Sequence, residues 1–201
     1  MPAQSPRTDP STVDGPSRPH VVPEPPRIGP GGFRELGVLN WAFCRTASLV
    51  TGVPDAHIFS TLGRARGLFR GWLHFSAMMM PFGRIRRRET ELVILRVAHL
   101  RGCDYELDHH RRLGARVGID DAVLQRVLEG PDAEGWHPNE RALLLAVDQL
   151  VLQRDVDDDT WATVASYFDR RQLIELVMLV GQYDALATTL GVLRVQRDFA
   201  S

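Results

Sequence analysis

Arg88–Gly118, RETELVILRVAHLRGCDYELDHHRRLGARVG, combines an apolar helical run with a dense group of reactive side chains. Glu91 lies inside the run, which a glycine then interrupts. If a new helix begins directly after Cys103, Glu106 and His110 are four residues apart on one side of it, beside the thiol. A thiol, a carboxylate and an imidazole on one side predict a proton-transfer or thiol site.

Glu91 shares a helix face with Leu95 and Ala98, where an ionised carboxylate is costly unless it is paired. Burial on that face is expected to raise the pKa of Glu91 towards the range of a general base. The alternative is an ion pair on the helix surface with Arg87 or Arg88.

Cys103 stands at the predicted helix start, where unpaired backbone amides and the helix dipole lower a thiol pKa. We therefore consider Cys103 a candidate peroxide-reactive thiolate. The alternative is a small buried hydrophobic residue, since Cys44 is the only other cysteine and lies far away in sequence. Cys103 with Glu106 and His110 does not match a zinc-ligand spacing, so no metal is expected.

Glu106 and His110 can hydrogen-bond directly, so that the carboxylate orients the imidazole and keeps its pKa near neutrality. The alternative is an ordinary surface pair at the same spacing. Tyr105 is a candidate substrate-binding residue, through its hydroxyl, or a packing residue. Asp108 and His109 fall on the other side of the helix and are expected to meet solvent.

The stretch resembles the carboxymuconolactone decarboxylase and alkylhydroperoxidase-D superfamily, whose signature is a helical Glu, a turn, a Cys or Glu before a His, and then small residues. The matching positions are Glu91, Cys103, Glu106, His110, Gly114 and Gly118. The hydroperoxidase branch carries a Cys-x-x-Cys pair, but here Glu106 stands in place of the second cysteine. The decarboxylase branch reads Glu-Leu-x-x-His, which Glu106, Leu107 and His110 match.

This resemblance implies an all-α, compact multi-helix bundle that assembles into trimers or hexamers and needs no cofactor or metal. It implies a decarboxylase-like lyase acting on a small carbonyl, lactone or carboxylate compound. His110 would be the acid or base, Glu106 would orient it, and Glu91 would be a second proton carrier. One alternative is an oxidoreductase that reduces hydroperoxides through Cys103, and another is a non-catalytic binding or assembly protein.

Composition restricts the partners. The formal net charge is −1 and the sequence pI is about 6.7, so electrostatics favours neither nucleic acid nor an anionic membrane. Small molecules and further copies of the chain remain as partners. Two cysteines, apolar runs shorter than a membrane span and no leader pattern predict a cytoplasmic protein.

Proline divides the chain into two parts. Residues 1–32 are rich in proline and poor in large apolar side chains, which predicts a disordered tail. Residues 33–201 show helical periodicity and predict one all-α domain. The expected helices span residues 34–51, 56–79, 85–100, 104–117, 120–128, 139–153, 158–167 and 171–193.

A basic run precedes the central stretch, at Arg84, Arg86, Arg87 and Arg88. The simple interpretation is a solvated turn and helix start. If some of these arginines face the pocket, their guanidinium groups suit a carboxylate-bearing substrate.

Overall fold

The computed structural model describes residues 25–199, which form α-helices and one 3-10 helix without a strand. The all-α fold expected from the sequence is confirmed. The helices are α1 (Phe33–Thr51), α2 (His57–Leu62), α3 (Arg66–Met79), α4 (Arg87–Leu100), α5 (Asp104–Ala115), α6 (Asp121–Glu129), α7 (Pro138–Gln153), α8 (Asp158–Ala165) and α9 (Arg170–Leu193).

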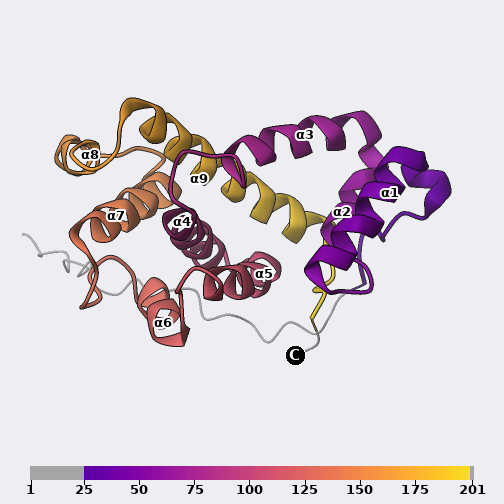
Figure 1. Ribbon diagram of the computed structural model, residues 1–201, viewed down its shortest axis with the longest axis horizontal. Coiled ribbons are helices and arrows are strands. Elements are labelled where there is room, and N and C mark those ends of the chain that lie inside the picture. Colours follow the sequence, from indigo (N-terminus) through magenta and orange to yellow (C-terminus); the bar gives the residue numbers. More distant parts are fainter. Residues whose placement is uncertain (1–24, 200–201) are drawn as a thin grey trace, which may run out of the picture.

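Helix α4 is the centre of the bundle and packs against α5, α6, α7 and α9 (Figure 1). Every residue from Glu89 to Ala98 is buried, as expected for a helix that is covered on all sides. Besides Glu89 in its first turn, the interior of α4 carries two buried charged side chains of opposite sign, Glu91 and Arg96. Both must therefore be paired inside the protein.

Helices α1, α2 and α3 form the opposite end of the molecule from α6 and α8 (Figure 1). The single helix expected over residues 56–79 is wrong, because a 3-10 turn at Gly63–Ala65 divides it. A tertiary contact explains the break: the Asn40 side chain donates to the Gly63 carbonyl at 2.9 Å. A β-carbon at position 63 would also lie 2.7 Å from the Leu36 side chain, so α1 can pack this closely here because residue 63 is a glycine.

Residues 25–32, which the sequence analysis assigns to the disordered tail, lie against the helical body. The Arg27 amide donates to the Leu193 carbonyl at 3.0 Å, and the Gly31 amide donates to the Ser60 carbonyl at 2.8 Å. The rest of the predicted tail, residues 1–24, lies outside the described residues.

Helix α9 is long and apolar enough, by length and composition alone, to cross a membrane. Its packing supplies another reason for that composition, because α9 runs alongside α3, α4, α7 and α8. Leu176, Leu179 and Leu190 of α9 are buried there.

Large apolar side chains also remain exposed on several helices. They include Leu39 and Leu49 of α1, Leu68 and Met78 of α3, and Ile174 and Met178 of α9. Such surfaces are typical of self-associating proteins. Assembly into trimers or hexamers stays a prediction.

Arg96 allows a test of the buried charge in α4. Its guanidinium binds both Asp148 oxygens, at 2.6 and 2.7 Å, and donates to the carbonyls of Val127 and Leu128 at 2.9 Å. Arg96→Leu leaves these acceptors without a donor, so we expect it to lower the free energy of unfolding by about 3 kcal/mol. Urea unfolding followed by circular dichroism measures the change.

The matched control is Arg111→Leu, which breaks the solvent-exposed pair of Arg111 with Asp121. We expect the control to change the free energy of unfolding by no more than about 0.5 kcal/mol. Equal losses in the two variants would contradict the structural role of Arg96.

Candidate functional site

The site forms where α5 folds back against α4. Gly102, with a positive φ of 60°, turns the chain between the two helices. Helix α5 packs against α4, and Gly114 of α5 leaves room for Ile119 after the helix, since a β-carbon there would lie 3.2 Å from Ile119 Cβ. This close packing brings His110 of α5 against Glu91 of α4.

Four side chains form a continuous polar chain. Glu91 Oε1 accepts from Arg87 Nε at 2.7 Å, and Glu91 Oε2 lies 2.7 Å from His110 Nδ1. His110 Nε2 then lies 3.2 Å from Glu106 Oε2. Glu91, Glu106 and His110 are all buried. Burial of Glu91 and its pairing with Arg87, which are alternatives in the sequence analysis, occur together in the structure.

In this chain of side chains, the charged neighbours of His110 and Glu91 shift the pKa of both. Burial alone would lower the pKa of His110, but Glu106 and Glu91 raise it to about 9. Burial alone would raise the pKa of Glu91, but His110 and Arg87 hold it below its ordinary value. The expectations of a raised Glu91 pKa and a near-neutral His110 pKa are therefore wrong. At neutral pH an imidazolium lies between two carboxylates.

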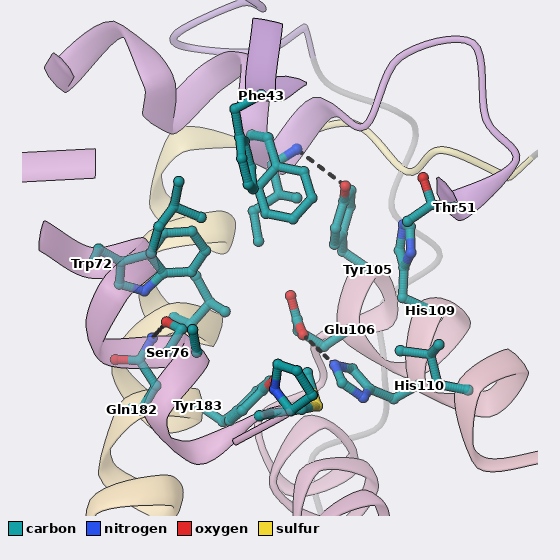
Figure 2. Close-up of a pocket in the computed structure, with 18 residues that line it drawn as sticks. Phe43, Thr51, Trp72, Ser76, Tyr105, Glu106, His109, His110, Gln182 and Tyr183 are labelled. Carbon is teal, nitrogen blue, oxygen red and sulfur yellow. Dashed lines mark hydrogen bonds and ion pairs between the residues drawn. The ribbon is translucent and has the colours of Figure 1, made fainter. Parts of the chain in front are cut away.

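A cavity of about 350 Å³ lies beside this chain, between α1–α3 on one side and α5 and α9 on the other (Figure 2). Glu106 points into the cavity, and His110 lies behind it (Figure 2). The ring of Tyr183 meets the His110 ring edge to face, with centroids 5.3 Å apart. The side chain that meets a ligand most directly is therefore Glu106.

Cys103 does not line this cavity. Its side chain packs in the main hydrophobic core, although the residue lies at the first turn of α5 as expected. Burial, together with the Glu106 and Asp104 charges, raises the pKa of Cys103 to about 12 and outweighs the amide hydrogen bonds of α5. The expected low thiol pKa is wrong. Cys44 is also buried, in a separate cluster of α1 and α3.

Tyr105 lines the cavity with its ring, while its hydroxyl is engaged elsewhere (Figure 2). The hydroxyl donates to Asp198 at 2.5 Å and accepts from the Ile58 amide at 3.1 Å. The expected solvent exposure of His109 is wrong, because the C-terminal segment folds back over α5. His109 Nε2 lies 2.9 Å from Asp198, and His57 Nδ1 lies 2.5 Å from its other oxygen.

Sequence reasoning missed Asp198, His57 and Tyr183. His57 and Asp198 are separated by 141 residues, so no local spacing relates them. Tyr183 is one of several polar or aromatic positions in a mainly apolar helix, and nothing in that pattern marks its contact with His110. The fold alone brings these residues to the site.

The basic run does not supply a cation to the cavity. Arg87 binds Glu91 behind the site, and Arg88 binds Glu140 on α7. Arg84 lies beside Glu175 at the N-terminal part of α9. Within residues 25–199, no cluster of three or more His, Cys, Asp or Glu side chains is placed to hold a metal ion.

Comparison with known proteins agrees with this architecture. The sequence model of the carboxymuconolactone decarboxylase family matches residues 66–149. The uncharacterised protein YdfG of Bacillus subtilis (strain 168) is 23% identical over 103 residues, which are 50% of this chain and 70% of YdfG.

Two solved structures share the fold. The alkylhydroperoxidase AhpD core of Ralstonia eutropha JMP134, an uncharacterised peroxidase-related protein, has 15% identity and a TM-score of 0.70, over 85% of this chain and 92% of that chain. The debrominase Bmp8 has 15% identity and a TM-score of 0.71, over 85% and 91% respectively. Residues 66–149 thus match the carboxymuconolactone decarboxylase family, and the chain has the alkylhydroperoxidase-D-like fold.

The charge state of His110 can be measured by NMR titration of its imidazole. We expect a midpoint near pH 9 in the native protein, and a lower midpoint in Glu91→Gln, which loses one of the two carboxylates. A native midpoint near the unfolded value of about 6.5 would contradict the proposed charge state.

The same shift has a consequence for stability. The folded pKa lies above the unfolded one, so the contribution of the His110 cation is complete below about pH 6.5 and is lost as the pH rises through about 9. We expect thermal stability to fall across this range, and to fall less in His110→Gln. An equal fall in both proteins would contradict this assignment.

Cys103 gives a separate prediction. A buried thiol with a pKa near 12 is almost fully protonated at pH 7.5, so it should react with iodoacetamide and hydrogen peroxide far more slowly than a thiol in an unfolded control peptide. Mass spectrometry of the folded protein follows the modification. Cys44 is the other cysteine of the chain, so in the Cys44→Ala variant any thiol modification occurs at Cys103. Rapid sulfenic acid formation at Cys103 would overturn this description.

Proposed function

We propose that this protein is a proton-transfer enzyme in which Glu106 is the base that meets the substrate. The observation that supports this most directly is that Glu106 points into the cavity (Figure 2), with His110 Nε2 3.2 Å from its Oε2. A carboxylate that faces a bound substrate is a suitable general base, because its oxygen can accept a proton directly.

The roles differ from those expected from the sequence. At pH 7 His110 already carries both ring protons and faces a carboxylate at each nitrogen, so it is a poor base. Its cation offsets the charge of Glu106. Glu91, fixed by Arg87, holds the imidazolium in place from the buried side. Glu91 is thus a positioning residue.

The proposed substrate is a small carbonyl or lactone compound with an acidic C–H bond. Glu106 takes the proton, the C–H electron pair stays on the substrate as an enolate, and a new O–H bond forms on Glu106. Return of a proton to the same or another atom completes an exchange or an isomerisation. Atoms and charge balance without an external oxidant.

Hydroperoxide reduction through Cys103 is the competing function, and the names of several structural relatives include peroxidase or AhpD. Here the position that a dithiol pathway requires is occupied by Glu106. Cys103 is buried and its thiolate is disfavoured. Debrominase Bmp8, crystallised as a cysteine-to-alanine variant with 2,3,4-tribromopyrrole, shows that the fold also holds small ring compounds. Proton transfer therefore suits this chain better.

Deuterium incorporation tests the proposal without knowledge of the natural substrate. The protein is incubated in D₂O with a panel of small cyclic ketones and lactones, and proton NMR follows exchange next to the carbonyl. We expect native protein to accelerate exchange of at least one compound, and Glu106→Gln to lose most of this rate, on the order of 100-fold or more.

Cys103→Ser is the control, because a hydroxyl preserves the size of the side chain and removes the thiol chemistry. We expect this variant to retain a substantial fraction of the exchange rate. Full activity of Glu106→Gln, or loss in Cys103→Ser equal to that in Glu106→Gln, would contradict the proposed roles. No acceleration by native protein for any compound would favour a non-catalytic binding protein.

A further inference from the structure

We propose that the cavity selects an uncharged, planar ring compound of one or two fused rings, bound with a single hydrogen-bond donor towards Glu106. This inference rests on the proposed function and narrows its substrate class to uncharged planar rings. It replaces the carboxylate-bearing substrate that the basic run suggested. Shape, charge and hydrogen bonding at the cavity each support one part of it. In a bound ring that is not turned over, the N–H or O–H donor occupies the Glu106 oxygen that would accept the C–H proton of a substrate.

The shape of the cavity suits flat rings. Its walls carry Phe43, Phe59 and Trp72 from α1–α3, and Tyr105 and Tyr183 from α5 and α9. These side chains come from five helices. Phe43, Trp72, Tyr105 and Tyr183 surround the space in front of Glu106 (Figure 2). Aromatic walls favour an aromatic or flat ligand through stacked and edge-to-face contacts. A cavity of about 150 Å³ holds benzene. One of about 350 Å³ therefore holds one or two fused rings with small substituents.

The charge of the cavity excludes an anionic ligand. Among the described residues that line it there is no arginine, and the cation nearest to Glu106 is His110. Both nitrogens of His110 already face carboxylates, at 2.7 and 3.2 Å. A ligand carboxylate would be desolvated beside Glu106 without a cation of its own, which costs far more than a neutral group does.

Hydrogen bonding in the cavity favours a donor at one point of the ligand. Glu106 has one oxygen directed at His110, and its carboxylate group faces the cavity (Figure 2). An N–H or O–H group of a ring compound can donate to it, and such a bond to a charged acceptor contributes more than one between neutral groups. The Tyr105 hydroxyl does not compete, because it already donates to Asp198.

Three ligands of similar size separate these features. Indole is neutral and has one N–H donor, benzofuran has the same shape without the donor, and indole-5-carboxylate carries a negative charge. Isothermal titration calorimetry at pH 7 on the native protein should give the order indole, then benzofuran, then indole-5-carboxylate. We expect each step to weaken binding about tenfold or more, in keeping with loss of a charge-assisted hydrogen bond and then burial of an unpaired charge.

Two substitutions locate the binding. Ala77→Trp fills the cavity from α3 and should abolish indole binding, whereas Ala115→Trp places the same side chain on the exposed end of α5 and should not change it. Glu106→Leu should remove the preference for indole over benzofuran. Since the ligand series uses the native protein, it decides the proposal even if the Ala77 variant does not fold.

Indole-5-carboxylate binding as tightly as indole would overturn the inference, and so would equal binding of indole and benzofuran or no binding of any of the three. The deuterium experiment is independent of this series. Indole binding in the predicted order without catalysed exchange would support the ligand class and contradict proton transfer. Exchange catalysed only on carboxylate-bearing ketones would support proton transfer and contradict the proposed ligand class.

Discussion

The fully buried carboxylate of Glu91, in the most enclosed helix of the bundle, is the constraint on which the site depends. An isolated carboxylate at such a position is too costly to remain ionised. Here Arg87 approaches one oxygen from within α4, and His110 approaches the other from α5. Helix α5 must therefore pack at the height and angle that bring His110 to Glu91. The same packing places Glu106 at the cavity, since it lies one helical turn before His110.

The pairing of acidic with basic side chains explains how Glu91, Glu106 and His110 can lie close together in the protein interior. Arg87 and His110 face the carboxyl groups of Glu91 and Glu106, so each acidic group in this chain of four lies next to a basic one. Each carboxylate faces at least one cation, and the pKa shifts of His110 and Glu91 both favour the ionised forms. Removing one member leaves an unpaired neighbour, so substitutions along this chain should not be additive.

The sequence was sufficient for the part of the site that is local. The four-residue spacing of Glu106 and His110, and the apolar face around Glu91, follow from helical periodicity, and the helix boundaries near Gly102 and Gly118 follow from turn chemistry. The sequence was not sufficient for contacts that depend on tertiary packing. Asn40 binds the Gly63 carbonyl where the expected second helix is interrupted, and Asp198 contacts His109, which was expected to meet solvent. Of the two interpretations of Cys103, the structure agrees with the small buried hydrophobic residue, because the start of α5 lies in the core.

Glu106 shows how one position can redirect the chemistry of a shared fold. A cysteine there, three residues after Cys103, would pair with it and exchange electrons. A carboxylate cannot form that bond, but its oxygens can accept a proton. The neighbouring His110 then has a different role. Its raised pKa favours the imidazolium, which pairs with the Glu106 side chain and does not activate a thiol. The Glu91–His110 pair joins α4 to α5 without using residue 106, so the packing of these helices does not depend on the chemistry proposed for Glu106.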